Sequence, residues 1–187
     1  MKQVKFVLCR HTEVDLNAQH RYTGQIDVPL NAVGKLQAKR LADQLSKFTI
    51  SAVFSSDLIR AVETASEITA LHPHIAPRTD PRLREVNLGQ LNGMLKSEVE
   101  KLYQNAIFST QHANFDFSAV GGESREQVIR RHIEFFDEVT NTLENDSGNP
   151  PFSVVVGHGT ALRIFLRHLG IKSLLEQGNY QIITYPN

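Results

Sequence analysis

The side chains best suited to phosphate chemistry follow apolar stretches of the chain. Arg10 and His11 come directly after VKFVLC, and His158 lies within GHG directly after FSVVV. Arg60 comes shortly after a third apolar stretch, in SSDLIR. The forked N–H donors of a guanidinium match the oxygens of a phosphate, so two arginines together can hold one. If these segments meet, they form a phosphate-binding site.

Short apolar stretches alternate with amphipathic ones, which predicts the elements that position these residues. Strands are expected over residues 5–9, 52–55 and 152–156, with an edge strand over 180–185, and helices over 31–47, 58–71, 124–145 and 161–169. This alternation predicts an α/β fold with three layers, α/β/α, and a largely parallel central sheet. Ligands of such sheets bind beyond the carboxyl ends of the strands, where Arg10, His11 and His158 fall.

Two helices show start signals, and two show apolar faces. Asn31 can cap the first helix, and Ser124 with Gln127 three residues later forms a capping box for the third. The apolar residues that suggest amphipathic helices are Val33, Leu36, Leu41 and Leu45 in the first, and Leu58, Val62, Ala65 and Ile68 in the second. The helix after Gly159 is expected to direct its positive N-terminal end at the phosphate.

The whole chain, residues 1–187, is expected to form one domain. Residues 87–122 fit the alternation poorly, so we interpret them as a small cap-like insertion over the active-site end of the sheet.

The composition narrows the classes of partner. Lys plus Arg equals Asp plus Glu at 20 each, so no overall charge favours nucleic acid or a membrane surface. No apolar stretch approaches the length of a membrane span or a signal sequence, and the single cysteine, Cys9, fits a reducing compartment. A cytoplasmic location is expected. The exposed edge expected at residues 180–185 is compatible with a homodimer.

Five segments in order resemble a known family. They are LCRHTEVDLNAQHRYTGQIDVPLNAVGKLQA, SSDLIRAVETA, LREVNLGQLNG, GGES and VVVGHGTALR. Together they resemble the histidine phosphatase superfamily, also called phosphoglycerate-mutase-like, over nearly the whole chain.

The resemblance implies a set of site residues. It implies that His11 is the nucleophile that takes up the phosphoryl group, with Arg10, Arg60 and His158 around the phosphate and Glu85 as the proton donor. It also implies that Asn17, Thr23 and Gly24 contact the phosphate or substrate, and we add Gly159 and Thr160 after the last buried strand to that expectation. No metal and no cofactor are expected, and the substrate is expected to be a small phosphorylated metabolite.

Two residues depart from the family pattern beside the nucleophile. Where the family has Arg-His-Gly, one variable residue and Thr, this chain has Thr12 after His11, and Val14 in place of the later hydroxyl. Our hypothesis is that the Thr12 hydroxyl donates to the phosphate and replaces the one that Val14 lacks. Weaker activity than is usual in the family is the other expectation.

The favoured interpretation is a metal-independent phosphatase that hydrolyses a small phosphomonoester through a phosphohistidine. One alternative is a cofactor-dependent phosphoglycerate mutase, which the absence of Lys and Arg from residues 104–120 disfavours. The other is a non-catalytic protein that binds a phosphorylated ligand, suggested by Thr12 and Val14.

Overall fold

The chain folds into a three-layer α/β/α sandwich, as the alternation of its segments predicts. The computed structural model describes residues 3–103, 116–143, 151–173 and 175–186. Its sheet has five strands in the order β3-β2-β4-β1-β5, parallel except for β5, which runs antiparallel to β1 at the edge. The strands are β1 (Val4–Arg10), β2 (Ile50–Ser55), β3 (Arg78–Thr79), β4 (Phe152–Gly157) and β5 (Tyr180–Tyr185).

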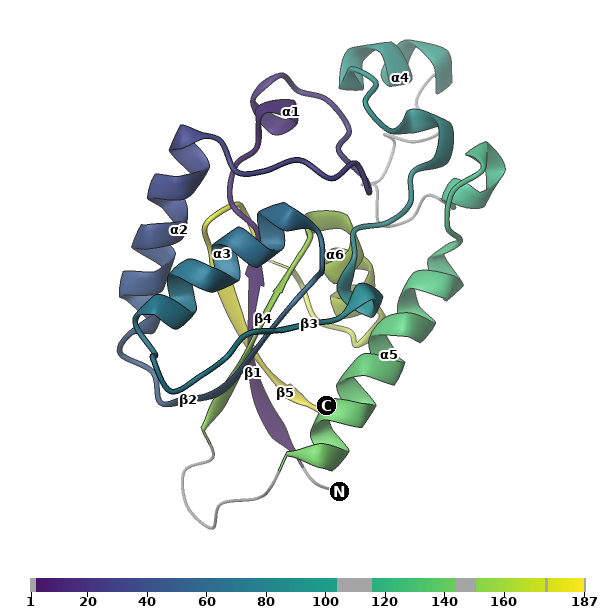
Figure 1. Cartoon of the computed structure of the whole chain (residues 1–187). Helices are drawn as coiled ribbons and strands as arrows, with labels where there is room; N and C mark the ends of the chain where they lie inside the picture. Colours follow the sequence, from purple (N-terminus) through teal and green to yellow (C-terminus); the bar gives the residue numbers. More distant parts are fainter. Residues whose placement is uncertain (1–2, 104–115, 144–150, 174, 187) are drawn as a thin grey trace.

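The four long helices flank the sheet in pairs (Figure 1). They are α2 (Ala32–Leu45), α3 (Ile59–Ala70), α5 (Arg125–Thr142) and α6 (Gly159–His168). The predicted start signals are confirmed: the Asn31 side chain accepts from the Gly34 N–H, and Ser124 with Gln127 forms the capping box of α5. The shorter elements, which periodicity does not detect, are α1 (Asp15–Ala18), α4 (Lys96–Tyr103), β3 and the 3₁₀ turns η1 (Pro81–Leu83), η2 (Gly89–Leu91) and η4 (Phe117–Val120).

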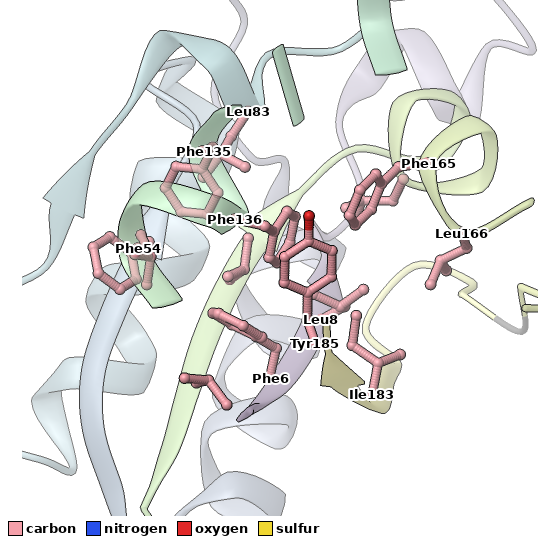
Figure 2. Packing of buried hydrophobic residues seen from close by; sticks show 14 of the residues in the cluster. Phe6, Leu8, Phe54, Leu83, Phe135, Phe136, Phe165, Leu166, Ile183 and Tyr185 are labelled. Atoms are coloured by element: carbon pink, nitrogen blue, oxygen red, sulfur yellow. The ribbon is translucent and has the colours of Figure 1, made fainter. Parts of the chain in front are cut away.

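Alternate residues of the strands face the two helical layers. Val7 and Cys9 of β1 pack in one cluster with side chains of α2 and α3, whereas Phe6 and Leu8 pack in another with α5 and α6. Figure 2 shows this second cluster, in which Phe136 stacks on Phe165 with ring centroids 4.6 Å apart. Burial on both faces explains why the central strands are nearly continuous apolar runs.

The apolar faces suggested for α2 and α3 are only partly correct. Val33 and Leu36 are 50% and 59% exposed, because α2 packs through smaller residues next to Leu41 and Leu45. Val62 of α3 is half-buried, while Arg60 lies on the buried face of that helix. Gly34 of α2 lies against the Glu13 backbone and Ala38 packs with Val14 and Leu30, so these close contacts select small side chains, a preference that apolar periodicity does not report.

The segment predicted as an insertion carries its own apolar cluster. Leu88, Leu91, Val99 and Val120 pack with residues from the starts of α5 and α6. In Figure 1, α4 lies beyond the carboxyl ends of the central strands, on the same side as α1. Residues 104–115 of this segment lie outside the described residues. Within the described part of the chain, no helix is both long and apolar enough to span a bilayer.

Candidate active site

The predicted site residues gather around one cavity at the carboxyl ends of the parallel strands. The cavity measures about 230 Å³. Its lining residues are Arg10, His11, Asn17, Arg21, Tyr22, Thr23, Gly24, Arg60, Glu85, Leu88, Lys96, Gly159, Thr160 and Arg163. Two predicted site residues, Thr12 and His158, are fully buried and are absent from this lining.

His11 is held in one orientation by its own backbone neighbour. Its N–H bonds to the Gly157 carbonyl at 2.9 Å, which continues the β1–β4 pairing. Its ring Nδ1 lies 2.7 Å from the Thr12 carbonyl oxygen, an acceptor, so Nδ1 must carry the proton. The unprotonated Nε2 then holds the lone pair. Burial, with Arg60 and Arg10 nearby, lowers the pKa of His11 well below its usual value and keeps the ring neutral.

Arg60 reaches His11 from the buried face of α3. Its Nε donates to Nε2 of His11 at 3.3 Å, and its two terminal nitrogens donate to the carbonyls of Gly24 and Ile26 at 2.6 and 2.8 Å. Burial lowers the pKa of Arg60 to about 10, so the side chain remains a cation at neutral pH. Gly24 has a positive φ of 49°, a backbone conformation that suits glycine and turns its carbonyl toward Arg60.

His158 and Arg10 present buried polar atoms that lack partners. The His158 ring lies 5.0 Å from the His11 ring, and neither of its nitrogens has a hydrogen-bond partner among the residues that the structure describes. Nε of Arg10 also has no hydrogen-bond partner among the described residues. A Cβ at Gly159 would lie 2.9 Å from that Nε, so a larger residue there would displace the Arg10 side chain. Buried polar atoms are usually paired, so these atoms call for a ligand that supplies the acceptors.

Glu85 is fixed at the N-terminal end of α6. Its carboxylate accepts the N–H groups of Thr160 and Ala161 at 3.2 and 2.8 Å, and that of Val86 at 3.0 Å. The N-terminal end of α6 does lie at the cavity, with Gly159 and Thr160 in the lining. Two of its N–H groups orient the Glu85 carboxylate.

The loop that carries Glu85 is anchored from two sides. Arg84 makes a bidentate pair with Asp57, with N–O distances of 2.6 and 2.7 Å. Arg131 of α5 pairs with Glu123 at 2.9 Å and donates to the Glu85 carbonyl at 3.4 Å. The arginines beside Glu85 are thus structural partners of acidic residues, whereas Glu85 itself turns to the cavity.

Asn17 and Thr23 are linked to each other. The Asn17 amide donates to the Thr23 hydroxyl at 3.2 Å and accepts from the Gln177 amide at 2.6 Å. Gln177, which lies in the segment between α6 and β5, was not predicted. It belongs to no motif, and only the tertiary contact reveals it.

Thr12 and Val14 contribute to packing. The Thr12 hydroxyl lies 3.4 Å from the Thr64 hydroxyl of α3, and its backbone N–H donates to the same oxygen at 3.3 Å. Val14 is completely buried with Leu30 and Ala38. The hypothesis that the Thr12 hydroxyl donates to the phosphate therefore lacks the required geometry, because this side chain faces α3 and does not line the cavity.

Three further cations line the cavity that sequence reasoning missed. Arg21 lies within HRYTGQ and donates to the Gly93 carbonyl at 2.7 Å, Lys96 begins α4, and Arg163 lies one turn into α6. Burial, with Arg10 and Arg163 nearby, lowers the pKa of Lys96. The spacing from Gly159 to Arg163, one helical turn, is the signal that could have found Arg163. Among the described lining residues, Glu85 supplies the only carboxylate.

Comparison with known proteins establishes the family. The family model described as histidine phosphatase superfamily, branch 1, matches residues 6–183. The chain belongs to the histidine phosphatase superfamily. Membership in this family supports the prediction that the protein is an enzyme, either a phosphatase or a mutase.

Individual relatives carry both kinds of name. The chain is 37% identical to phosphoglycerate mutase-like protein 4 of Arabidopsis thaliana, over 85% of this chain and 68% of that protein. It is 34% identical to phosphoserine phosphatase 1 of Hydrogenobacter thermophilus, over 86% of this chain and 73% of that protein. A solved mycobacterial glucosyl-3-phosphoglycerate phosphatase superposes with a TM-score of 0.82 at 25% identity, over 96% of this chain and 92% of that one.

Proposed function

We propose that this member of the family is a metal-independent phosphatase that hydrolyses a small phosphomonoester through a phosphohistidine at His11. The observation that carries the proposal is the state of the His11 ring. The Thr12 carbonyl fixes the proton on Nδ1, so Nε2 carries the lone pair, which accepts from Nε of Arg60 at 3.3 Å and must leave that hydrogen bond to attack phosphorus. A neutral imidazole held in this way is a competent nucleophile toward phosphorus.

The phosphoryl group would complete the hydrogen bonds that this site lacks. Its oxygens would accept from Nε of Arg10 and from the one ring nitrogen of neutral His158 that carries a proton, and Arg60 would contribute a third set of donors. Donors spread around the transferring group stabilise the charge that its oxygens carry in the transition state.

Two steps account for hydrolysis. In the first, Nε2 of His11 forms a bond to phosphorus while the ester P–O bond breaks, and Glu85 gives its proton to the leaving alkoxide. In the second step, Glu85 takes a proton from water as the water attacks phosphorus. The N–P bond then breaks and releases inorganic phosphate.

The test of this proposal is capture of the intermediate. Brief reaction with a phosphomonoester, followed by an alkaline quench and mass analysis, should reveal an acid-labile phosphoryl group on the peptide that contains His11. His11→Ala should abolish both the adduct and turnover, and turnover should persist in excess chelator. Near-normal turnover by His11→Ala, or a strict requirement for added Mg²⁺, would disprove the proposal.

A phosphoglycerate mutase is the second candidate, and the additional cations favour it. Arg21, Lys96 and Arg163 supply basic groups outside residues 104–120, the segment whose lack of Lys and Arg disfavours a mutase. A carboxylate on the substrate would suit these cations. Incubation with a phosphoglycerate and a phosphorylated mutase cofactor distinguishes the two, because a mutase returns the isomeric phosphoglycerate and a phosphatase returns inorganic phosphate.

A further inference from the structure

A short turn between α6 and β5 reaches the catalytic site from near the end of the chain. The side-chain nitrogen of Gln177 donates to the side-chain oxygen of Asn17 at 2.6 Å, across 160 residues of sequence. The side-chain nitrogen of Asn17 donates in turn to the hydroxyl oxygen of Thr23 at 3.2 Å. Asn17 and Thr23 line the cavity, and Gln177 is not among the described lining residues. Gln177 therefore contacts the site through Asn17.

The backbone of this turn has a defined conformation. The Asn179 N–H donates to the Glu176 carbonyl at 3.2 Å, which closes a four-residue β-turn. Gly178 has a φ of 70°, which matches the third position of a type II turn, where glycine is favoured. Gln177 occupies the second position, so its side chain leaves the turn from a fixed place.

The turn is also held by the elements around it. Leu175, before the turn, is buried in the core, and β5 begins two residues after Gly178. A Cβ at Gly178 would lie 3.4 Å from Cβ of Gln37 in α2 and 3.8 Å from the methyl group of Thr12. The turn thus lies close to α2 and to the residue that follows the nucleophile. This packing brings the side chain of Gln177 to the cavity side of the sheet.

The direction of the two hydrogen bonds decides what Thr23 offers to a ligand. An amide nitrogen only donates, an amide oxygen only accepts, and a hydroxyl does both. Because Gln177 donates to the Asn17 oxygen, the Asn17 nitrogen is the atom that faces Thr23. The Thr23 oxygen then accepts, and its hydrogen is left to donate into the cavity. If both bonds ran the other way, the hydrogen would be used on Asn17 and Thr23 would present only a lone pair.

The charge of the cavity favours the direction that the structure shows. Five cations line the cavity, and Glu85 supplies the only carboxylate among the described lining residues, so an anion is the expected ligand. The five are Arg10, Arg21, Arg60, Lys96 and Arg163. A phosphate oxygen accepts hydrogen bonds and is repelled by a lone pair, so Thr23 suits this ligand only when its hydrogen is free to donate.

We propose that Gln177 is a positioning residue that sets the direction of these hydrogen bonds, so that Thr23 donates to the phosphate. The inference rests on the proposed phosphatase function, because it places the phosphate of the substrate in this cavity. Gln177 touches no reacting atom and acts through the Asn17 amide. Since the donors are oriented before the substrate binds, no reorganisation is needed when the phosphate arrives.

The experiment replaces Gln177 in two ways. Gln177→Met keeps the length of the side chain and removes both polar atoms. Gln177→Glu has nearly the same shape but presents only acceptors, so the Asn17 nitrogen must turn toward it and the Asn17 oxygen toward Thr23. Both substitutions are made in the wild type and in Asn17→Ala. Gln44→Met and Gln44→Glu, at an exposed position of α2, are the matched controls.

Two quantities are measured for each variant. They are the affinity for inorganic phosphate, by calorimetry, and kcat/KM for nitrophenyl phosphate. Gln177→Met should lower both about fivefold, and Gln177→Glu should lower both on the order of fiftyfold, because reversal replaces a donor to the phosphate with a lone pair. In Asn17→Ala neither substitution should have a further effect above about twofold. The Gln44 variants should behave as the wild type.

Two results would overturn the inference. Equal losses in Gln177→Met and Gln177→Glu would show that the direction of the hydrogen bonds does not matter. Losses of full size in Asn17→Ala would show that Gln177 acts through the structure of the turn, or through the added charge of the glutamate, and not through Asn17.

Phosphate binding separates this inference from the proposed function. If no variant turns over any substrate, the phosphatase proposal fails. The calorimetric affinities for inorganic phosphate then still decide the role of Gln177, because they do not depend on a chemical step. A wild type that binds no phosphate would contradict the inference as well.

Discussion

At the scale of single residues, the catalytic roles depend on which groups hold each side chain. Glu85 is held by three backbone N–H groups, two of them at the start of α6, so its carboxyl oxygens have a defined direction. His11 is held by the Thr12 carbonyl through Nδ1. Both side chains are therefore preorganised for their proposed roles before a substrate binds.

Glu85→Gln should slow the enzyme most with poor leaving groups. An alkyl alkoxide needs a proton to leave, whereas a nitrophenolate needs little help, so turnover of alkyl phosphates should fall about 10²–10⁴-fold and that of nitrophenyl phosphate far less. The measurement is the single-turnover rate of enzyme phosphorylation with each substrate. Glu126→Gln, at an exposed position of α5, is the control. Equal losses on both substrates would remove Glu85 from the role of proton donor.

Thr12→Val should leave catalysis nearly unchanged. The Thr12 hydroxyl contacts Thr64 and not the cavity, and the Thr64 hydroxyl keeps its bond to the Arg60 carbonyl without it. The substitution preserves shape and removes one buried hydrogen bond, so the free energy of unfolding should fall by about 1 kcal/mol. Steady-state kinetics and urea unfolding measure the two effects. A loss of kcat on the order of tenfold or more would indicate that the hydroxyl turns to the phosphate during the reaction.

At the scale of elements, the loop that carries Glu85 is held in place by hydrogen bonds from α5 and from the turn before α5. Arg131 of α5 donates to the carbonyls of Arg82 and Glu85, and its partner Glu123 accepts the Asn87 N–H. A Cβ at Gly122 would lie 2.2 Å from the Asn87 carbonyl oxygen, so the loop and the turn can approach this closely only because the residue is glycine. The GGES segment thus supports the active site from outside the cavity.

Arg131→Gln should therefore act through Glu85. We expect turnover of alkyl phosphates to fall on the order of tenfold while nitrophenyl phosphate is affected much less, the same dependence on leaving group as in Glu85→Gln. Arg130→Gln, one residue earlier and exposed, is the matched control and should behave as the wild type. If Arg131→Gln slowed both substrates equally, Arg131 would be a residue of general stability and not a positioning residue.

At the scale of the whole molecule, three buried neutral histidines among the described residues link stability to pH. Burial lowers the pKa of His132 to about 3, and burial with nearby cations lowers the pKa values of His11 and His158 well below their usual range. In the unfolded chain each histidine titrates near pH 6.5. Below that pH the unfolded state therefore binds protons that the folded state does not, so stability should fall as the pH falls from 6.5 toward 3.

The expected loss can be measured with one histidine at a time. For His132 alone, the free energy of unfolding should decrease by about 2 kcal/mol from about pH 7 to about pH 5. Urea unfolding across this range should show a shallower pH dependence in His132→Gln than in the wild type, while His168→Gln, at an exposed position, keeps the wild-type slope. Identical slopes in His132→Gln and the wild type would contradict the assignment of a neutral His132.

The fold class and the strand-end residues of the site could be predicted from the sequence because both are local properties. The spacing of apolar residues identified the four longest strands and the four long helices, and the carboxyl ends of the central strands placed Arg10, His11 and His158 at one edge. The single turns α1, η1, η2 and η4 carry too few residues for a period to appear.

The remaining features of the site depend on contacts between residues far apart in the chain. Arg60 bonds to carbonyls 34 and 36 residues away, and Glu85 bonds to N–H groups 75 and 76 residues away. The side chain of Thr12 faces Thr64, 52 residues away, for the same reason. The sequence by itself determined which residues lie at strand ends and where the long helices lie. Only the tertiary structure decided which distant group each polar side chain meets, because hydrogen bonds across elements depend on packing geometry that no local pattern encodes.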